Sequence, residues 1–238
     1  MLQIGILGAG AMGNVLSQMI DDADDAVCVG IVDPLAGETL EKLGDDPDVI
    51  IDFSNPANLD MLIDYCSSHN CPAVIATTGF THEQQAFIAG LSRRVPVVFA
   101  ANFSLGITVM KRVLAEIAPI LENSFDMEVI EKHHNKKLDS PSGTAKMLVA
   151  ALNPDHEYEE VNGREGNRKR GKEIGIHAVR GGTIAGEHEV IFAGEDEILE
   201  IKHTAGSKKI FAAGAVTAAR FTQSAEAGLY NMENVLFG

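Results

Sequence analysis

The feature that most constrains the fold is a set of three glycines near the start of the 238-residue chain. The apolar residues 4–7 are typical of a buried strand, and Gly8, Gly10 and Gly13 follow them directly. At this spacing the first glycine permits a tight turn, the second lets the backbone approach a pyrophosphate, and the third allows a helix to pack closely on a strand. The segment therefore predicts the strand, turn and helix that begin a parallel α/β sheet.

A carboxylate further along the chain extends this pattern to a dinucleotide site. Asp33 follows the apolar run 27–32 and lies twenty residues after Gly13, where it can accept hydrogen bonds from ribose hydroxyls. The start of the helix supplies N–H groups to phosphates. A glycine turn that serves packing only is the competing interpretation. The residues expected to bind the dinucleotide here are Gly8, Ala9, Gly10, Ala11, Met12, Gly13 and Asp33.

The first hundred residues repeat one theme, in which short apolar runs alternate with stretches of helical spacing such as 57–69 and 81–91. This alternation predicts a Rossmann-type, doubly wound parallel sheet. In such sheets the ligand lies beyond the carboxyl ends of the strands. The runs are residues 4–7, 27–32, 49–53, 74–77 and 95–100, and the strand-end residues expected to face a cofactor are Phe53, Ala76, Thr77, Thr78, Ala100, Ala101, Asn102 and Phe103.

The pattern changes after Asn102, which predicts a second, smaller α+β domain with an open sheet. We expect a dinucleotide-binding domain of residues 1–103 and 210–238, and a substrate-binding and oligomerisation domain of residues 104–209. The alanine-rich segment 210–229 has helical spacing and is expected to pack back on the first domain. In the second domain we predict helices at 108–121 and 144–152 and strands at 125–132, 174–179, 187–192 and 199–203.

Composition narrows the possible partners and the compartment. With 34 acidic and 19 basic residues the net charge is -15, which argues against nucleic acid or an anionic membrane as the main partner. The three cysteines, Cys28, Cys66 and Cys71, lack the spacing of a zinc site and suit a reduced, cytoplasmic chain. No apolar stretch has the length of a membrane span, and the first residues do not form a signal peptide.

One loop is basic in this otherwise acidic chain. Five basic residues fall within nine positions, and they are Arg164, Arg168, Lys169, Arg170 and Lys172. The loop is either a solvated surface segment or an electrostatic funnel for an anionic substrate or a cofactor phosphate.

The densest chemistry lies between residues 131 and 145, after a predicted strand and before a predicted helix. His133 can deliver a proton near neutral pH, and Lys137 adds a positive charge. Ser142, Gly143 and Thr144 lie where a helix begins, so their N–H groups are expected to be free to bind a carboxylate. Solvated surface polarity and a metal site are competing interpretations, although adjacent histidines lack the usual helical spacing of metal ligands.

The same segment, Glu131-x-His133-His134-x-x-Lys137-x-Asp139-x-Pro141-Ser142-Gly143-Thr144-Ala145, resembles the signature of the dihydrodipicolinate reductases. The resemblance extends over most of the chain and includes residues 8–13, 52–54, 76–80, 101–104, 180–182 and 228–230. It implies a Rossmann domain with a tetramer-forming sheet domain, a bound NADH or NADPH, and no metal.

The resemblance also implies an activity and roles for single residues. It implies that NADH or NADPH reduces 4-hydroxy-tetrahydrodipicolinate, via dihydrodipicolinate, to tetrahydrodipicolinate in lysine and diaminopimelate biosynthesis. His133 is then the proton donor and Lys137 its cationic helper, while His134, Gly143 and Thr144 hold the substrate carboxylates. Another two-domain nicotinamide oxidoreductase and a non-catalytic NAD-sensing protein are the alternatives.

Three positions depart from the family pattern. Many members carry a basic residue where this chain has Ala11 and another where it has Pro34. Both departures bear on how a 2'-phosphate would be held, so the choice between NADH and NADPH is open. Ser140 replaces the usual alanine, and we expect that change to be silent.

Overall fold

The computed structural model describes residues 1–238 and divides them into two compact units. The first unit comprises residues 1–105 and 208–238, and the second comprises residues 106–207. These limits differ by two residues from those expected from the sequence. None of the helices is long and apolar enough to cross a membrane.

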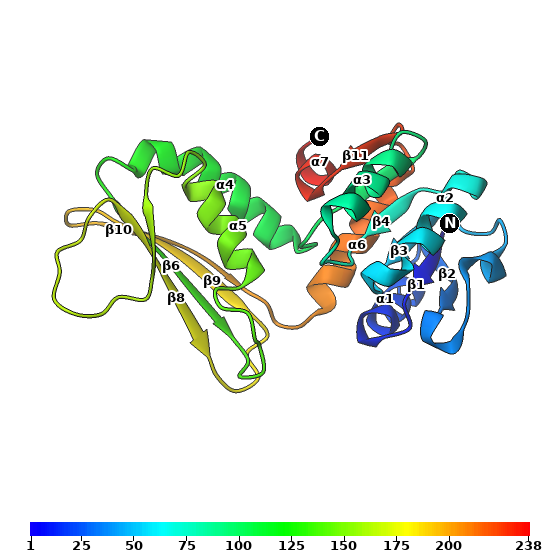
Figure 1. Ribbon diagram of the computed structural model, residues 1–238, viewed down its shortest axis with the longest axis horizontal. Coiled ribbons are helices and arrows are strands. Elements are labelled where there is room, and N and C mark those ends of the chain that lie inside the picture. Colours follow the sequence, from blue (N-terminus) through cyan, green and yellow to red (C-terminus); the bar gives the residue numbers. More distant parts are fainter. The chain divides into compact units, whose positions relative to one another are not determined.

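The first unit is built on a six-stranded sheet in which every strand pair is parallel (Figure 1). The strand order is β11-β5-β4-β3-β1-β2, so the direction of winding reverses between β1 and β3. The strands are β1 (Leu2–Leu7), β2 (Ala26–Val32), β3 (Val49–Asp52), β4 (Ala73–Ile75), β5 (Pro96–Phe99) and β11 (Gly228–Tyr230). The helices are α1 (Ala11–Asp21), α2 (Leu59–His69), α3 (His82–Leu91), α6 (Lys209–Thr222) and α7 (Met232–Phe237).

Helices bury both faces of this sheet, as the continuous apolar runs predicted. One core contains residues of α2 and α3 packed on β3, β4 and β5, with Leu62 and Ile88 fully buried. The other contains residues of α1 and α6, with Leu16 and Ala215 fully buried. The predicted return of the C-terminal segment to the first domain is confirmed, because α6 forms part of the second core. The doubly wound prediction is confirmed as well.

The predicted helix over residues 210–229 is wrong at its end. Helix α6 stops at Thr222, and Gly228–Tyr230 forms β11, which pairs in parallel with β5. The short helix α7 then begins at Met232, capped by the Asn231 side chain. The sequence does not indicate this strand, because three residues are too few to show an alternating pattern.

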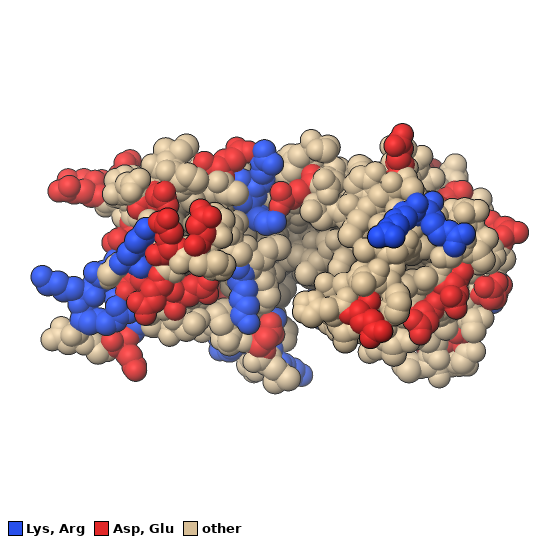
Figure 2. Space-filling view, turned by 45° about the horizontal axis from the view of Figure 1, so that its top comes forward, with Lys and Arg blue, Asp and Glu red and all other residues tan.

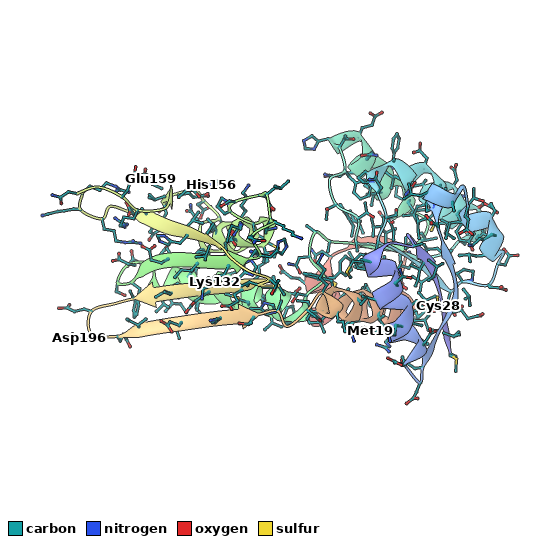
Figure 3. The ribbon with its side chains drawn as sticks, turned by 90° about the horizontal axis from the view of Figure 1, so that it is seen from below. Met19, Cys28, Lys132, His156, Glu159 and Asp196 are labelled. Atoms are coloured by element: carbon teal, nitrogen blue, oxygen red, sulfur yellow. The ribbon has the colours of Figure 1, made fainter.

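The second unit is a five-stranded mixed sheet with helices on one face (Figure 1). Its strand order is β10-β9-β6-β8-β7, with β6, β8 and β7 parallel and β9 and β10 antiparallel to their neighbours. Figure 3 labels Asp196 at the turn between β9 and β10 and Lys132 toward the other end of the sheet. The elements are α4 (Leu105–Leu121), β6 (Asp126–His133), α5 (Gly143–Leu152), β7 (Glu159–Asn162), β8 (Glu173–Arg180), β9 (Glu187–Ala193) and β10 (Ile198–Thr204).

Alternation along β6 decides which side chains enter the core. Met127 and Val129 are buried with Leu114 of α4 and Leu148 of α5. The residues between them lie on the face that these helices do not cover, as expected for an open sheet. The same register continues to His133, the last residue of β6, and places it on the covered face with the core residues. The strand β7 was not predicted, because its sequence, EEVN, is polar and exposed.

The basic loop is tied to the sheet by ion pairs. Arg168 Nη1 lies 2.7 Å from a carboxylate oxygen of Glu173, which Arg164 also contacts, and Arg170 pairs with Glu128. Figure 2 shows basic and acidic side chains interleaved over the second unit. Because carboxylates of the same unit already neutralise these arginines, their arrangement does not favour a funnel for anions.

Candidate active site

The glycine turn of the first unit leaves no room for a side chain at two of its three glycines. Gly8 has a φ of +113°, and a Cβ there would lie 2.5 Å from the carbonyl oxygen of Phe53. A Cβ on Gly13 would overlap the carbonyl group of Gly8. A Cβ on Gly10, by contrast, would meet nothing within 4 Å. Two of the three glycines are therefore required by packing, and the third leaves open space beside the turn.

The start of α1 is available to an anion. Gly10 is the N-cap residue and provides no side-chain cap, and the first turn of α1 carries no acidic residue. Ala11 and Met12, also expected at the cofactor, lie in this first turn, and Ala9 precedes the N-cap. Uncapped N–H groups and the positive end of the helix dipole suit a pyrophosphate. The turn therefore fits a dinucleotide, which Gly8–Gly13 would hold at its phosphates.

Asp33 follows β2 and begins a short 3-10 helix, Pro34–Ala36. Its carboxylate accepts a hydrogen bond from the N–H of Leu35 at 3.0 Å. Its own N–H donates to Glu38, and Glu38 in turn pairs with Lys42. The one cation in this cluster is thus already bound to a carboxylate.

A buried aspartate links two of the strand ends expected at the cofactor. The Asp52 carboxylate accepts hydrogen bonds from the N–H of Ser54 at 2.9 Å and from its hydroxyl at 2.6 Å. The same N–H donates to the hydroxyl oxygen of Thr77 at 2.8 Å. Burial raises the pKa of Asp52 to about 6, against the opposing effect of these hydrogen bonds.

The other strand-end residues differ in exposure. Phe103 and Thr77 are buried, and the Phe103 ring packs against Phe53 at 6.4 Å between centroids. Thr78 and Ala101 are exposed, whereas Phe53, Ala76, Ala100 and Asn102 are half-buried. A ligand at the ends of β3, β4 and β5 could therefore contact the exposed and half-buried residues of this set.

In the second unit a fully buried carboxylate organises the end of β6. Glu131 has no exposed surface, and its Oε2 lies 2.6 Å from Nδ1 of His133. Arg180 donates to both carboxylate oxygens of Glu131 at 2.7 Å. The N–H of Ser142 donates to Oε1 at 2.9 Å. Burial alone would raise the pKa of Glu131, but the hydrogen bonds from Arg180, His133 and Ser142 outweigh it and lower the pKa.

A second histidine packs against His133. The rings of His133 and His188 meet edge to face with centroids 5.2 Å apart. Burial and the neighbouring His133 lower the pKa of His188 to about 4, so its imidazole is neutral at pH 7. Nε2 of His188 exchanges a hydrogen bond with the hydroxyl of Ser142 at 3.1 Å. On the other edge, a Cβ on Gly186 would lie 3.2 Å from Nε2 of His133.

The N–H groups at the start of α5 are less free than the sequence predicted. The N–H of Ser142 is not free, because it donates to Glu131, and the Ser142 hydroxyl caps the helix by accepting from the N–H of Ala145. Gly143 is the first residue of α5, and a Cβ there would meet nothing within 4 Å. Thr144 follows and is half-buried. Space for a ligand therefore begins at Gly143.

Lys137 lies beside this helix start and is paired. Its ammonium group is 2.8 Å from the carboxylate of Asp139. The hydrogen bond from Lys137 and, to a smaller extent, the N–H of Gly143 lower the pKa of Asp139. Nδ1 of His134 is buried and has no hydrogen-bond partner. The structure thus brings His133, Lys137, Ser142 and Gly143 together around the end of β6.

Sequence reasoning missed roles for three residues here. Glu131 lies two positions before His133 on the same strand face, a period of two that could have indicated their contact. Arg180 is the register partner of His133 on β8, and His188 is that of Glu131 on β9. These cross-strand neighbours depend on sheet order, which a single sequence does not reveal.

Models of one family match both units. The model described as "Dihydrodipicolinate reductase, N-terminus" matches residues 2–103, and "Dihydrodipicolinate reductase, C-terminus" matches residues 106–236. The two matches together span almost the entire chain.

Relatives and a solved structure agree with these models. The chain is 44% identical over 238 residues to a 4-hydroxy-tetrahydrodipicolinate reductase of Brachyspira hyodysenteriae, covering 99% of this chain and 100% of the relative. It is 42% identical to the enzyme of that name from Clostridium tetani, covering 99% and 97%. The structure of a dipicolinate-bound dihydrodipicolinate reductase from Paenisporosarcina sp. TG-14 superposes with a TM-score of 0.84 at 25% identity, covering 99% and 100%. The chain belongs to the dihydrodipicolinate reductase family.

Proposed function

We propose that this protein reduces 4-hydroxy-tetrahydrodipicolinate, via dihydrodipicolinate, to tetrahydrodipicolinate with NADH or NADPH, in lysine and diaminopimelate biosynthesis. The observation that carries the proposal is the cluster at the end of β6. A histidine held by a buried carboxylate, a lysine and an open helix start occur together there. This set offers one proton donor and several anion-binding groups, as a cyclic dicarboxylate requires.

A nicotinamide cofactor, held at its phosphates by Gly8–Gly13, would supply the hydride for carbon 4 of the ring once the 4-hydroxyl has left as water. The protein residues handle the proton and the charge. Negative charge builds on the ring nitrogen as hydride arrives, so the cation of Lys137 stabilises the transition state more than the ground state. His133 then donates a proton to the anion that hydride addition leaves on the ring, and it does so from Nε2 of its imidazolium because Nδ1 faces Glu131.

Capture of the substrate carboxylates falls to groups around the start of α5. The N–H groups at Gly143 and Thr144 lie at the positive end of this helix, and Lys137 is held near it through Asp139. The family resemblance adds His134 to this set. Asp139 pairs with Lys137 and is half exposed, with 55% of its side chain accessible. An incoming carboxylate therefore competes with Asp139 for Lys137, which favours ligands with more than one carboxylate.

A coupled assay tests the activity. Dihydrodipicolinate synthase would generate the substrate, with NADH and NADPH supplied in parallel, and oxidation of the cofactor would be followed by absorbance. Substrate-dependent oxidation supports the proposal. A non-catalytic NAD-sensing protein would bind the cofactor without turnover, and another nicotinamide oxidoreductase would turn over a different substrate.

The uncovered sheet face also suggests an assembly. Residues of β8, β9 and β10 on this face include exposed Val179 and Ile198 beside charged side chains. A homotetramer built on this sheet would cover them, and the family resemblance favours it. Light scattering that reports a monomer at micromolar concentration would contradict this assembly. We place the enzyme in the cytoplasm, in keeping with its three free cysteines.

A further inference from the structure

The carboxylate of Glu131 accepts hydrogen bonds from more groups than a single ion pair with Arg180 would provide. Its two carboxylate oxygens accept four hydrogen bonds: from His133, from the Ser142 N–H and two from Arg180. Three of these donors come from different parts of the second unit, namely the end of β6, the end of β8 and the start of α5. One carboxylate therefore connects the proposed proton donor, a guanidinium and the proposed anion-binding helix.

This arrangement selects one form of the His133 ring. An ionised carboxylate only accepts hydrogen bonds, so the 2.6 Å contact requires a proton on Nδ1. In the neutral ring the lone pair is then on Nε2, the atom beside Gly186, so the proton that the imidazolium can transfer is the one on Nε2. Arg180 keeps Glu131 ionised, because its hydrogen bonds contribute to the lowered pKa of that carboxyl.

Arg180 also ties down the loop that connects His133 to α5. Its Nη2 donates to the carbonyl oxygen of Asp139 at 2.6 Å as well as to Glu131. The loop is thereby held at Asp139 by Arg180 and at Ser142 by Glu131. The distance between the His133 ring and the first residues of α5 thus depends on this pair.

We propose that Glu131 and Arg180 are positioning residues for the reduction, which hold Nδ1 of His133 protonated and fix its ring relative to the start of α5. The inference rests on the proposed function for its kinetic consequence. Neither residue is assigned to touch the substrate, and both act through His133 and the loop that follows it.

The main test is Glu131→Gln, which keeps the side-chain shape and removes the charge. Its amide can donate to Nδ1, which would move the proton of the neutral ring to Nε2 and leave the Nδ1–H of the imidazolium without its carboxylate acceptor. We expect kcat to fall by roughly 10²-fold, since general acid catalysis contributes about 10² to 10⁴, while KM for the cofactor changes by less than about threefold. Nitrogen NMR of histidine-labelled protein at alkaline pH, assigned with His133→Gln, should show the Nδ1–H form in wild type and its loss in Glu131→Gln.

The matched control is Glu128→Gln on the same strand. Glu128 contacts His177 at 2.7 Å and pairs with Arg170, so it reproduces the glutamate, histidine and arginine grouping on the opposite sheet face. Its kcat should remain within about twofold of wild type. An equal loss in both variants would show a general effect on the sheet and overturn the proposal.

Arg180→Gln and the double variant Glu131→Gln/Arg180→Gln complete a double-mutant cycle, in which kcat is compared among the four proteins. Removing Arg180 alone leaves a buried unpaired carboxylate, so the double variant should be no less active than the poorer single variant. If the losses of activity in the two single variants added up in the double variant, the proposal that Glu131 and Arg180 act together would be overturned. If wild type fails to turn over the substrate, the proposed function fails, but the NMR comparison still tests whether Glu131 sets the form of His133. An unchanged ring form in Glu131→Gln would overturn the inference.

Discussion

Replacing Asp52 by asparagine is expected to stabilise the protein, increasingly so as the pH rises. Asp52 is 2% exposed at the end of β3, and burial raises its pKa from an ordinary 3.8 to about 6. The folded state therefore holds the proton more tightly than the unfolded state, and the stability from this group falls as the pH rises from about 4 to about 6. Asparagine retains an oxygen for the hydrogen bonds from Ser54 and carries no charge.

The magnitude follows from the two pKa values. Their difference corresponds to a loss of about 3 kcal/mol in the free energy of unfolding of the wild type at pH 8, of which roughly 0.8 kcal/mol arises between pH 5.5 and 8. The sequence pI of about 4.8 makes a lower starting pH unsuitable, because proteins near zero net charge precipitate. Lost hydrogen-bond strength to Ser54 reduces the absolute gain but changes little with pH.

Urea unfolding of wild type and Asp52→Asn at several pH values measures the difference between their free energies of unfolding. Asp64→Asn on α2 is the matched control, because Asp64 is exposed and the same charge is removed from the same unit. Carbon NMR of labelled aspartate carboxyls should also show a titration near pH 6 that Asp52→Asn removes. A free-energy gap that stays constant between pH 5.5 and 8, without such a titration, would refute the reasoning.

His133→Gln is expected to lower kcat by about 10²- to 10⁴-fold with cofactor affinity near wild type, and Lys137→Ala to behave similarly; turnover of both within about threefold of wild type would contradict their roles. Pyridine-2,6-dicarboxylate is expected to compete with substrate, and Asp139→Asn should bind it more tightly because Lys137 is released from its ion pair; weaker binding in titrations would count against that competition. NADH should serve at least as well as NADPH, because Asp33 suits free ribose hydroxyls and the nearby Lys42 is already paired. A catalytic efficiency about tenfold higher with NADPH would show a cation elsewhere in the ribose pocket.

Periodicity predicted most of the fold because it records burial directly. The apolar runs of the first unit are continuous, since helices cover both faces of that sheet, and β6 alternates because helices cover one face. Elements with little buried surface were missed. The polar strand β7 and the three-residue strand β11 owe their existence to pairing with β8 and β5, and their own residues show no pattern.

The same limit applies to the site. His133, Lys137 and the start of α5 lie close together in the sequence, so one segment was enough to group them. Arg180 is 49 residues from Glu131, and their contact follows from β8 pairing with β6 across a long connection. Local sequence cannot show which distant strand is the neighbour, and therefore it cannot show which cation meets a buried carboxylate.

The two cations of the site have different roles because the carboxylate partner of one is buried and that of the other is exposed. Arg180 and Lys137 each face a carboxylate, so the cluster is close to neutral before a ligand enters. Glu131 is fully buried, and stripping it of Arg180 would leave an uncompensated charge out of reach of water, a change that costs several kcal/mol. Asp139 is 55% exposed, and water can replace Lys137 at small cost. An anionic substrate therefore takes Lys137 from Asp139 and leaves Arg180 in place, which lets an acidic chain bind a dianion without disturbing its proton donor.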